Sequence, residues 1–172
     1  MDVSDYIGFV ASEGERFASA AEQGDLSVAF APCPGWDMRE LVRHLGMIHL
    51  WAAANVAFPE PDWLDVDDLP DLVRYWPELA AAYPEDANPV DWYRDTLVNL
   101  LGVLKSAPAD LECFSFLPAP SPLAMWARRQ ASEIAIHRFD AELSRGITSQ
   151  FDPQFDPQFA TDMLDELMSG FT

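Results

Sequence analysis

The sequence predicts an all-α fold, a bundle of long helices with a single core. Apolar side chains recur every three to four residues along several stretches, and prolines or glycines interrupt the chain between these stretches. The alternating run Phe114–Phe116 is too short to found a sheet. With 172 residues, 49% of them apolar, the chain suits one domain with a sizeable core. Long amphipathic helices joined in this way favour an antiparallel four-helix bundle.

The first two helices have clear boundary signals. The first is predicted from Ser4 to Glu22, because its apolar residues recur with helical spacing and Gly24 follows as a stop. The second is predicted to begin after Asp37, since Asp37 and Glu40 have the spacing of a capping box. It is expected to end near Phe58, where a proline follows.

Three more helical segments follow along the chain. A short helix near Asp71–Ala82, kinked at Pro77, is expected within a long connection rich in proline and aspartate, Pro59–Pro89. Two long helices are predicted at Val90–Ser106 and Leu123–Arg145, and a second proline-rich loop separates them. The long proline-rich connections therefore lie between helices that are themselves regular.

The last part of the chain is expected to differ from the bundle. We assign residues 1–148 to the bundle and 149–172 to a linker-like tail with a tandem Phe-Asp-Pro-Gln repeat. A short helix from Phe159 to Met168 is predicted there, with an apolar side formed by Met163, Leu164 and Leu167.

The strongly negative net charge of the chain disfavours negatively charged binding partners. The chain has 29 acidic and 10 basic residues and a net charge of −19, so it would be repelled by nucleic acid and by anionic membranes. No apolar run approaches the ~18 residues that span a bilayer, and the N-terminus lacks the basic and apolar regions of a secretory signal. We expect a cytoplasmic protein whose two distant cysteines, Cys33 and Cys113, are free thiols.

Metal ligation is the chemistry that the residues suggest most directly. Glu133 and His137 are four residues apart, which places them on one face of a helix, and His44 lies on the inward stripe of another. Two imidazoles and one carboxylate suit a divalent metal, zinc above all, and leave a coordination position open. The same residues also fit a surface hydrogen bond and a core histidine. His49 lies ~140° further around the helix than His44, which disfavours it as a ligand and leaves a peripheral role open.

Two stretches of the chain resemble a known family. Residues 33–46 read Cys-Pro-Gly-Trp-Asp-Met-Arg-Glu-Leu-Val-Arg-His-Leu-Gly, and residues 126–142 contain Arg-Arg-Gln-Ala-Ser-Glu-Ile-Ala-Ile-His-Arg-Phe-Asp-Ala-Glu. They are similar to the two signatures of the mycothiol-dependent maleylpyruvate isomerase family, a branch of the DinB-like metal-binding helix bundles. The tail from Asp156 onward also resembles that family's stretch after the bundle.

The resemblance implies a fold, a ligand set and a cofactor. The fold would be a DinB-like antiparallel four-helix bundle, with His44, Glu133 and His137 binding Zn²⁺ or another divalent metal. Mycothiol, a low-molecular-weight thiol, would be the cofactor. Two departures matter: Ser132 replaces the histidine usual before the ligand glutamate, and the family's C-terminal domain is absent after Thr172, which puts isomerase activity in doubt.

These expectations define a hypothesis for function. The metal would activate the thiol for attack on an electrophilic small molecule, in isomerase or S-transferase chemistry. Asp140 or a backbone carbonyl would orient His137. Three arginines are candidates for binding the carboxylates of thiol or substrate: Arg43, Arg128 and Arg129. The pairs Arg129–Glu133 and Arg138–Glu142 also fit ordinary contacts within one helix.

Other functions fit the same residues. The chain would then be a non-catalytic metal-binding or dimerisation module, a truncated relative without the C-terminal domain. DinB-like bundles can pair through their helices, which allows a homodimer. In a third interpretation the bundle holds no metal, and His44 and His137 are core residues. In the thiol-activating interpretation a cavity would be lined by Met47, Trp51 and Trp126. The same three residues are equally suited to an ordinary hydrophobic core.

Overall fold

The described part of the protein is built from helices. The computed structural model describes residues 1–29, 33–59, 73–81, 88–150 and 156–170. Within these ranges there is no strand, and an isolated bridge pairs Ala29 with Asp37. The prediction of an all-α fold is thereby confirmed. The helices are α1 (Val3–Ala21), α2 (Met38–Ala57), α4 (Pro77–Ala81), α5 (Pro89–Ser106), α6 (Pro122–Ser144) and α7 (Asp156–Gly170).

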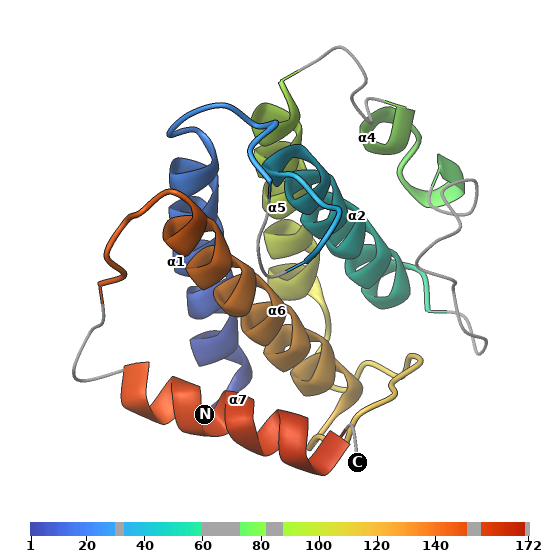
Figure 1. Cartoon of the computed structure of the whole chain (residues 1–172). Coiled ribbons are helices and arrows are strands. Elements are labelled where there is room, and N and C mark those ends of the chain that lie inside the picture. Colours follow the sequence, from blue (N-terminus) through green and yellow to red (C-terminus); the bar gives the residue numbers. More distant parts are fainter. Residues whose placement is uncertain (30–32, 60–72, 82–87, 151–155, 171–172) are drawn as a thin grey trace.

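Four long helices surround the core. Contacts join α1 to α6, α6 to α2, α2 to α5 and α5 to α1, so the four helices form a closed ring (Figure 1). Helix α7 lies across one end of this ring, and α4 lies beside α5 (Figure 1). No helix of the described residues is both long and apolar enough to cross a membrane. The largest side chains that are fully buried in the ring come from all four helices: Trp126, Tyr93, Phe17, Met38, Leu41 and Leu45.

The start of α2 is fixed by its local sequence. The Asp37 carboxylate accepts a hydrogen bond from the Glu40 backbone N–H at 2.9 Å, and the Glu40 carboxylate accepts one from the Asp37 N–H at 2.7 Å. This reciprocal pair is the capping box that the sequence predicts. Gly35 just before it has a φ of +94°, which a side chain would disfavour. The turn and the cap together set where α2 begins.

The boundaries of the long helices agree with the predicted ones to within a residue or so, whereas the short helix differs. Residues 73–75 are helical, Trp76 is not, and α4 begins at Pro77, so the predicted helix is interrupted before this proline rather than kinked at it. Proline is favourable at the first position of a helix, where its missing N–H has no partner to lose. Residues 71, 72 and 82, the ends of the predicted segment, lie outside the described residues.

Helices α2 and α5 approach each other closely at Gly46. A Cβ atom at this position would lie within 2.9 Å of three ring atoms of Trp92. The Trp92 ring is rigid and buried, and its Nε1 donates a hydrogen bond to the Leu79 carbonyl at 2.7 Å. Only a residue without a side chain therefore allows this approach. The position of α2 in the ring depends on this contact.

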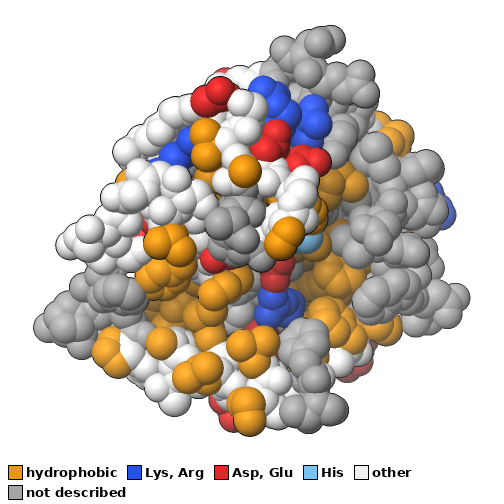
Figure 2. Space-filling view, viewed as in Figure 1, with side chains coloured by type: hydrophobic (Ala, Val, Ile, Leu, Met, Phe, Trp, Pro, Cys, Tyr) orange, Lys and Arg blue, Asp and Glu red, His pale blue; other side chains and the backbone are white. Residues whose placement is uncertain are grey.

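Helix α7 docks on the bundle through part of its surface. The Phe159 ring stacks on Phe9 of α1 at 4.0 Å between centroids, and the Tyr6 hydroxyl donates to Asp162 at 3.0 Å. The predicted apolar side is wrong at two positions, because Leu164 and Leu167 are 63% and 51% exposed. Figure 2 shows hydrophobic side chains gathered on the surface along this end of the molecule. Residues 151–155, the first part of the tandem repeat, lie outside the described residues.

Candidate metal centre

The three predicted ligands meet at the contact between α2 and α6. His44 comes from α2, and Glu133 and His137 come from successive turns of α6. The Nε2 atoms of both imidazoles lie 3.3 Å from Oε1 of Glu133. The two rings are 5.6 Å apart between centroids and almost perpendicular, at 87°. All three candidate ligand atoms lie within 4.8 Å of one another.

The spacing of these atoms fits a small divalent cation. Zinc bonds to imidazole nitrogen and carboxylate oxygen at about 2.1 Å, so neighbouring donors around a tetrahedral ion stand roughly 3.4 Å apart. Both nitrogen–oxygen distances in the cluster are 3.3 Å. Two nitrogen lone pairs and one carboxylate oxygen that face each other need a positive charge between them, whether a proton or a metal ion. The residues present therefore fit a metal.

Asp140 determines which nitrogen of His137 faces the cluster. Its carboxylate lies 3.2 Å from Nδ1 of His137. In the metal-free cluster Nε2 donates a hydrogen bond to Glu133. With a metal ion bound, a proton on Nδ1 would form a hydrogen bond to Asp140 and leave the Nε2 lone pair for the ion. Of the two partners expected for Nδ1, Asp140 or a backbone carbonyl, Asp140 is the one in contact.

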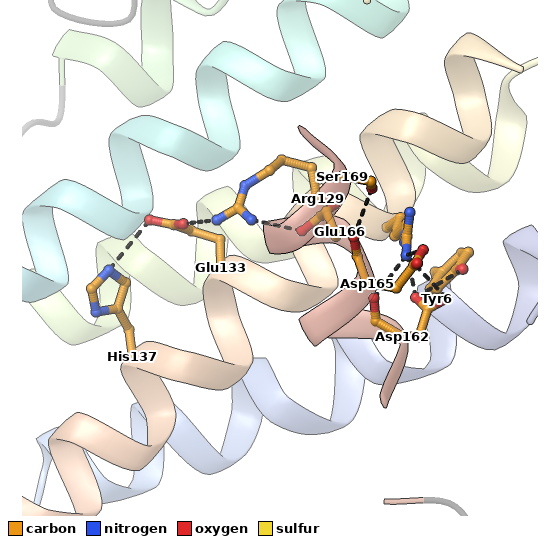
Figure 3. A network of polar contacts seen from close by, with 9 residues as sticks. Tyr6, Arg129, Glu133, His137, Asp162, Asp165, Glu166 and Ser169 are labelled. Carbon is orange, nitrogen blue, oxygen red and sulfur yellow. Dashed lines mark hydrogen bonds and ion pairs between the residues drawn. The ribbon is translucent and has the colours of Figure 1, made fainter. Parts of the chain in front are cut away.

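Glu133 is ionised and shared between two kinds of partner. Burial alone would raise its pKa, but hydrogen bonds from His137 and His44 and the charge of Arg129 outweigh burial. The pKa of Glu133 is consequently held well below its usual range. Oε1 faces the imidazoles of His44 and His137. Oε2 forms an ion pair with Arg129, and Figure 3 shows Glu133 between His137 and this arginine. The carboxylate is therefore available as an anionic ligand on the side of the histidines.

One side of the cluster reaches the surface. The His44 side chain is 32% exposed, against 14% for His137. The Trp36 ring meets the His44 ring edge-on at 5.2 Å between centroids. In Figure 2 a histidine, an acidic and a basic side chain are visible close together near the middle of this face. A ligand approaching from solvent would thus meet His44 first.

Two of the three arginines predicted to bind a cofactor, Arg128 and Arg129, are engaged with carboxylates. Arg128 forms ion pairs with Asp162 at 3.0 Å and with Asp165 at 2.9 Å. Arg129 pairs with Glu133 and, at 2.8 Å, with Glu166 of α7. Arg43 is half-buried on α2. The Arg129–Glu133 and Arg138–Glu142 helix pairs are present. A cofactor-binding role for Arg43, Arg128 and Arg129 stays a prediction.

His49 lies outside the ligand set, as its place on the helix suggests. It is fully buried, and its Nδ1 lies 3.0 Å from the Thr96 hydroxyl. Burial lowers the pKa of His49 to about 3, so this imidazole is neutral. Within the described residues its Nε2 has no hydrogen-bond partner.

Other residues considered from the sequence belong to the core or its edge. Trp51 and Trp126 are buried and meet edge-on at 4.8 Å between centroids, so they are core residues, whereas Met47 is half-buried. Cys33 and Cys113 are both free thiols, as predicted. Burial raises the pKa of the Cys113 thiol.

Sequence reasoning did not find Glu166. This carboxylate is 2% exposed and contacts Arg129, which in turn contacts the candidate ligand Glu133. A signal was present, because Asp162 and Glu166 are one helical turn apart and the adjacent Arg128 and Arg129 carry the opposite charge. The spacing alone does not show which acidic and basic residues meet.

The fold and the cluster together define an all-α protein with a candidate His–Glu–His metal site. A family model described as the mycothiol maleylpyruvate isomerase N-terminal domain matches residues 10–142, which include all three residues of the cluster. The chain belongs to this family. Comparison with curated proteins and comparison with solved structures each give no match.

Proposed function

We propose that the protein binds zinc, or a similar divalent cation, through His44, Glu133 and His137 and uses it to activate a low-molecular-weight thiol. The observation that carries the proposal is the convergence of two Nε2 atoms and one carboxylate oxygen within 4.8 Å of one another. Three ligands leave a coordination position open, which is typical of catalytic zinc sites. A zinc ion bound there would stabilise a thiolate over a thiol, because two neutral imidazoles and one carboxylate leave it a net positive charge.

The residues of the chain have separate roles in this proposal. Glu133 supplies the anionic ligand, and Arg129 holds its second oxygen away from the imidazoles. Asp140 keeps the Nε2 lone pair of His137 directed at the cluster. His44, the most exposed of the three ligands, leaves the solvent side accessible to a thiol and an electrophile.

Family membership supports mycothiol as the thiol. We propose an electrophilic small molecule as its partner, which the thiolate attacks in one of two ways. It adds to one carbon of a double bond and leaves again after rotation about the resulting single bond, or it displaces a leaving group such as chloride from carbon and forms a thioether. These are isomerase and S-transferase reactions respectively, and the thiolate is the nucleophile in both.

Metal analysis of the purified protein tests the proposal. We expect about one zinc per chain in the wild type and little in His44→Ala and His137→Ala variants. Equally little zinc in all three proteins would contradict the metal site. A conjugation assay with bimane and mycothiol on the zinc-loaded protein then tests thiol transfer. Zinc without conjugation would favour the non-catalytic metal-binding or dimerisation module, whose oligomeric state sedimentation would measure.

A further inference from the structure

A relay of charged side chains links helix α7 to the candidate metal centre. Arg129 donates through one guanidinium nitrogen to Glu133 and through another to Glu166 at 2.8 Å (Figure 3). The side chains of Arg129 and Glu166 are 15% and 2% exposed. Glu166 of α7 and the candidate ligand Glu133 therefore share one guanidinium. Water screens charges little at this buried place.

The hydrogen bond to Glu166 limits how the Arg129 guanidinium can contact Glu133. The two terminal nitrogens of the Arg129 guanidinium are divided between two carboxylates: Nη2 donates to Glu133 and Nη1 donates to Glu166. Without the charge of Glu166, Arg129 would be free to turn both nitrogens onto Glu133 and compete with the imidazoles for Oε1. The positive charge of Arg129 would also be uncompensated near the site of a cation. Both changes oppose metal binding.

Docking of α7 does not depend on Glu166 alone. Arg128 of α6 pairs with Asp162 at 3.0 Å and with Asp165 at 2.9 Å. Phe159 of α7 also stacks on Phe9 of α1. A neutral residue at position 166 therefore removes one charge while the other contacts of α7 stay in place.

We infer that Glu166 is a positioning residue of the metal centre, acting on Glu133 through Arg129, so that the docking of α7 sets the affinity for metal. This inference rests on the metal site proposed above. It gives α7, which lies beyond the residues 10–142 that match the family, a part in the site.

The test compares metal binding by matched variants of the full chain. Cobalt(II) titration followed by visible absorption, and zinc competition with a chromogenic chelator, would be measured for wild type, Glu166→Gln and Asp165→Asn. We expect Glu166→Gln to bind both metals about tenfold more weakly, the lower end of the effect of outer-shell partners. Asp165→Asn removes the same charge from the neighbouring residue, which pairs with Arg128 and is 72% exposed. We expect its affinity to stay within about twofold of wild type.

A double-mutant cycle separates the relay from a loss of structure. In an Arg129→Met background, Glu166→Gln should change metal affinity by less than about twofold, because its route to Glu133 is gone. Glu166→Asp, which keeps the charge, should recover most of the affinity. Circular dichroism of each metal-free variant would check that the helices form.

The outcomes distinguish the inference from the proposal beneath it. Wild type that binds cobalt and zinc, with Glu166→Gln equal to it, would overturn the relay and leave the metal site standing. Equal weakening by Glu166→Gln and Asp165→Asn would overturn the relay too, since it would reflect only the charge of α7. Wild type that binds neither metal would end both.

Discussion

Helix α6 carries two clusters of charge that are built differently. Near its C-terminal end, Arg138 pairs with Glu13 at 2.6 Å and with Glu142 at 2.8 Å, and Arg16 contacts the same two carboxylates. Two guanidinium groups thus balance two carboxylates in what we call the closed cluster: the buried Glu13, Arg138 and Glu142 and the half-exposed Arg16.

The cluster one to two turns earlier is not balanced. Its polar contacts join three carboxylates, those of Glu133, Asp140 and Glu166, to one guanidinium and two imidazoles. With neutral imidazoles the contacts sum to two negative charges in excess, which a divalent cation would offset. The closed cluster has no such deficit. The difference is that one group of charges on α6 is neutralised by its own side chains, whereas the other leaves an excess of negative charge.

Removing Arg138 should break the closed cluster with the largest effect. Arg138→Met leaves two buried carboxylates with only the half-exposed Arg16, so we expect the free energy of unfolding to fall by about 4 kcal/mol. Urea denaturation followed by circular dichroism would measure this. Arg16→Met is the control, with a loss of about 1 kcal/mol or less. Equal losses would show that the cluster is not closed.

Removing the carboxylate of the unbalanced cluster should affect metal more than folding. Glu133→Gln keeps the shape but loses the anionic ligand, so zinc affinity should fall at least about 100-fold. Equilibrium dialysis against zinc would measure it, with Glu142→Gln as the matched change in the closed cluster. Similar zinc binding by both variants would remove the distinction between the clusters.

The pH dependence of stability sharpens the comparison, because His49 is a buried imidazole outside both clusters. With a pKa of about 3 it stays neutral in the folded protein, whereas the unfolded chain takes up a proton below about pH 6.5. The free energy of unfolding should therefore fall by about 2 kcal/mol between pH 7 and pH 5 on this account. Urea titrations at both pH values would measure it. A His49→Asn variant that keeps the wild-type slope would refute this assignment.

Weakening the partner of His137 should give the smallest effect. Asp140→Asn keeps an acceptor for Nδ1 but removes its charge, so zinc affinity should drop about tenfold. Chelator competition would detect this, with Ser144→Ala as control. The Ser144 hydroxyl donates to the Asp140 backbone carbonyl at 2.9 Å. Stronger zinc binding by Asp140→Asn would contradict the role given to Asp140.

The helices and the cluster were predictable because their signals are local or periodic. The capping box of Asp37 and Glu40, and the spacing of Glu133 and His137, depend on residues within one turn of a helix. In the sequence, Arg129–Glu133 and Arg138–Glu142 have the same spacing and look like equivalent helix pairs. In the structure, Arg129 also pairs with Glu166 of α7, whereas Arg138 also pairs with Glu13 of α1.

Contacts between distant segments were not predictable in the same way. The apolar pattern of α7 suggested that Leu164 and Leu167 face the bundle, yet both are exposed and Glu166 between them is buried. Its burial depends on Arg129, which lies 37 residues earlier in the chain. A carboxylate that is buried because of a distant guanidinium leaves no periodic trace in the sequence.

The missing side chain at Gly46 bears on the size of the cation that the proposed site would bind. Residues two apart on a helix point in nearly opposite directions, so α2 rests on the Trp92 ring with one side and presents His44 with the other. How tightly the backbone seats against that ring sets how far the imidazole extends toward α6. At the proposed site, discrimination by ionic radius would therefore depend in part on a residue that has no donor atom to offer.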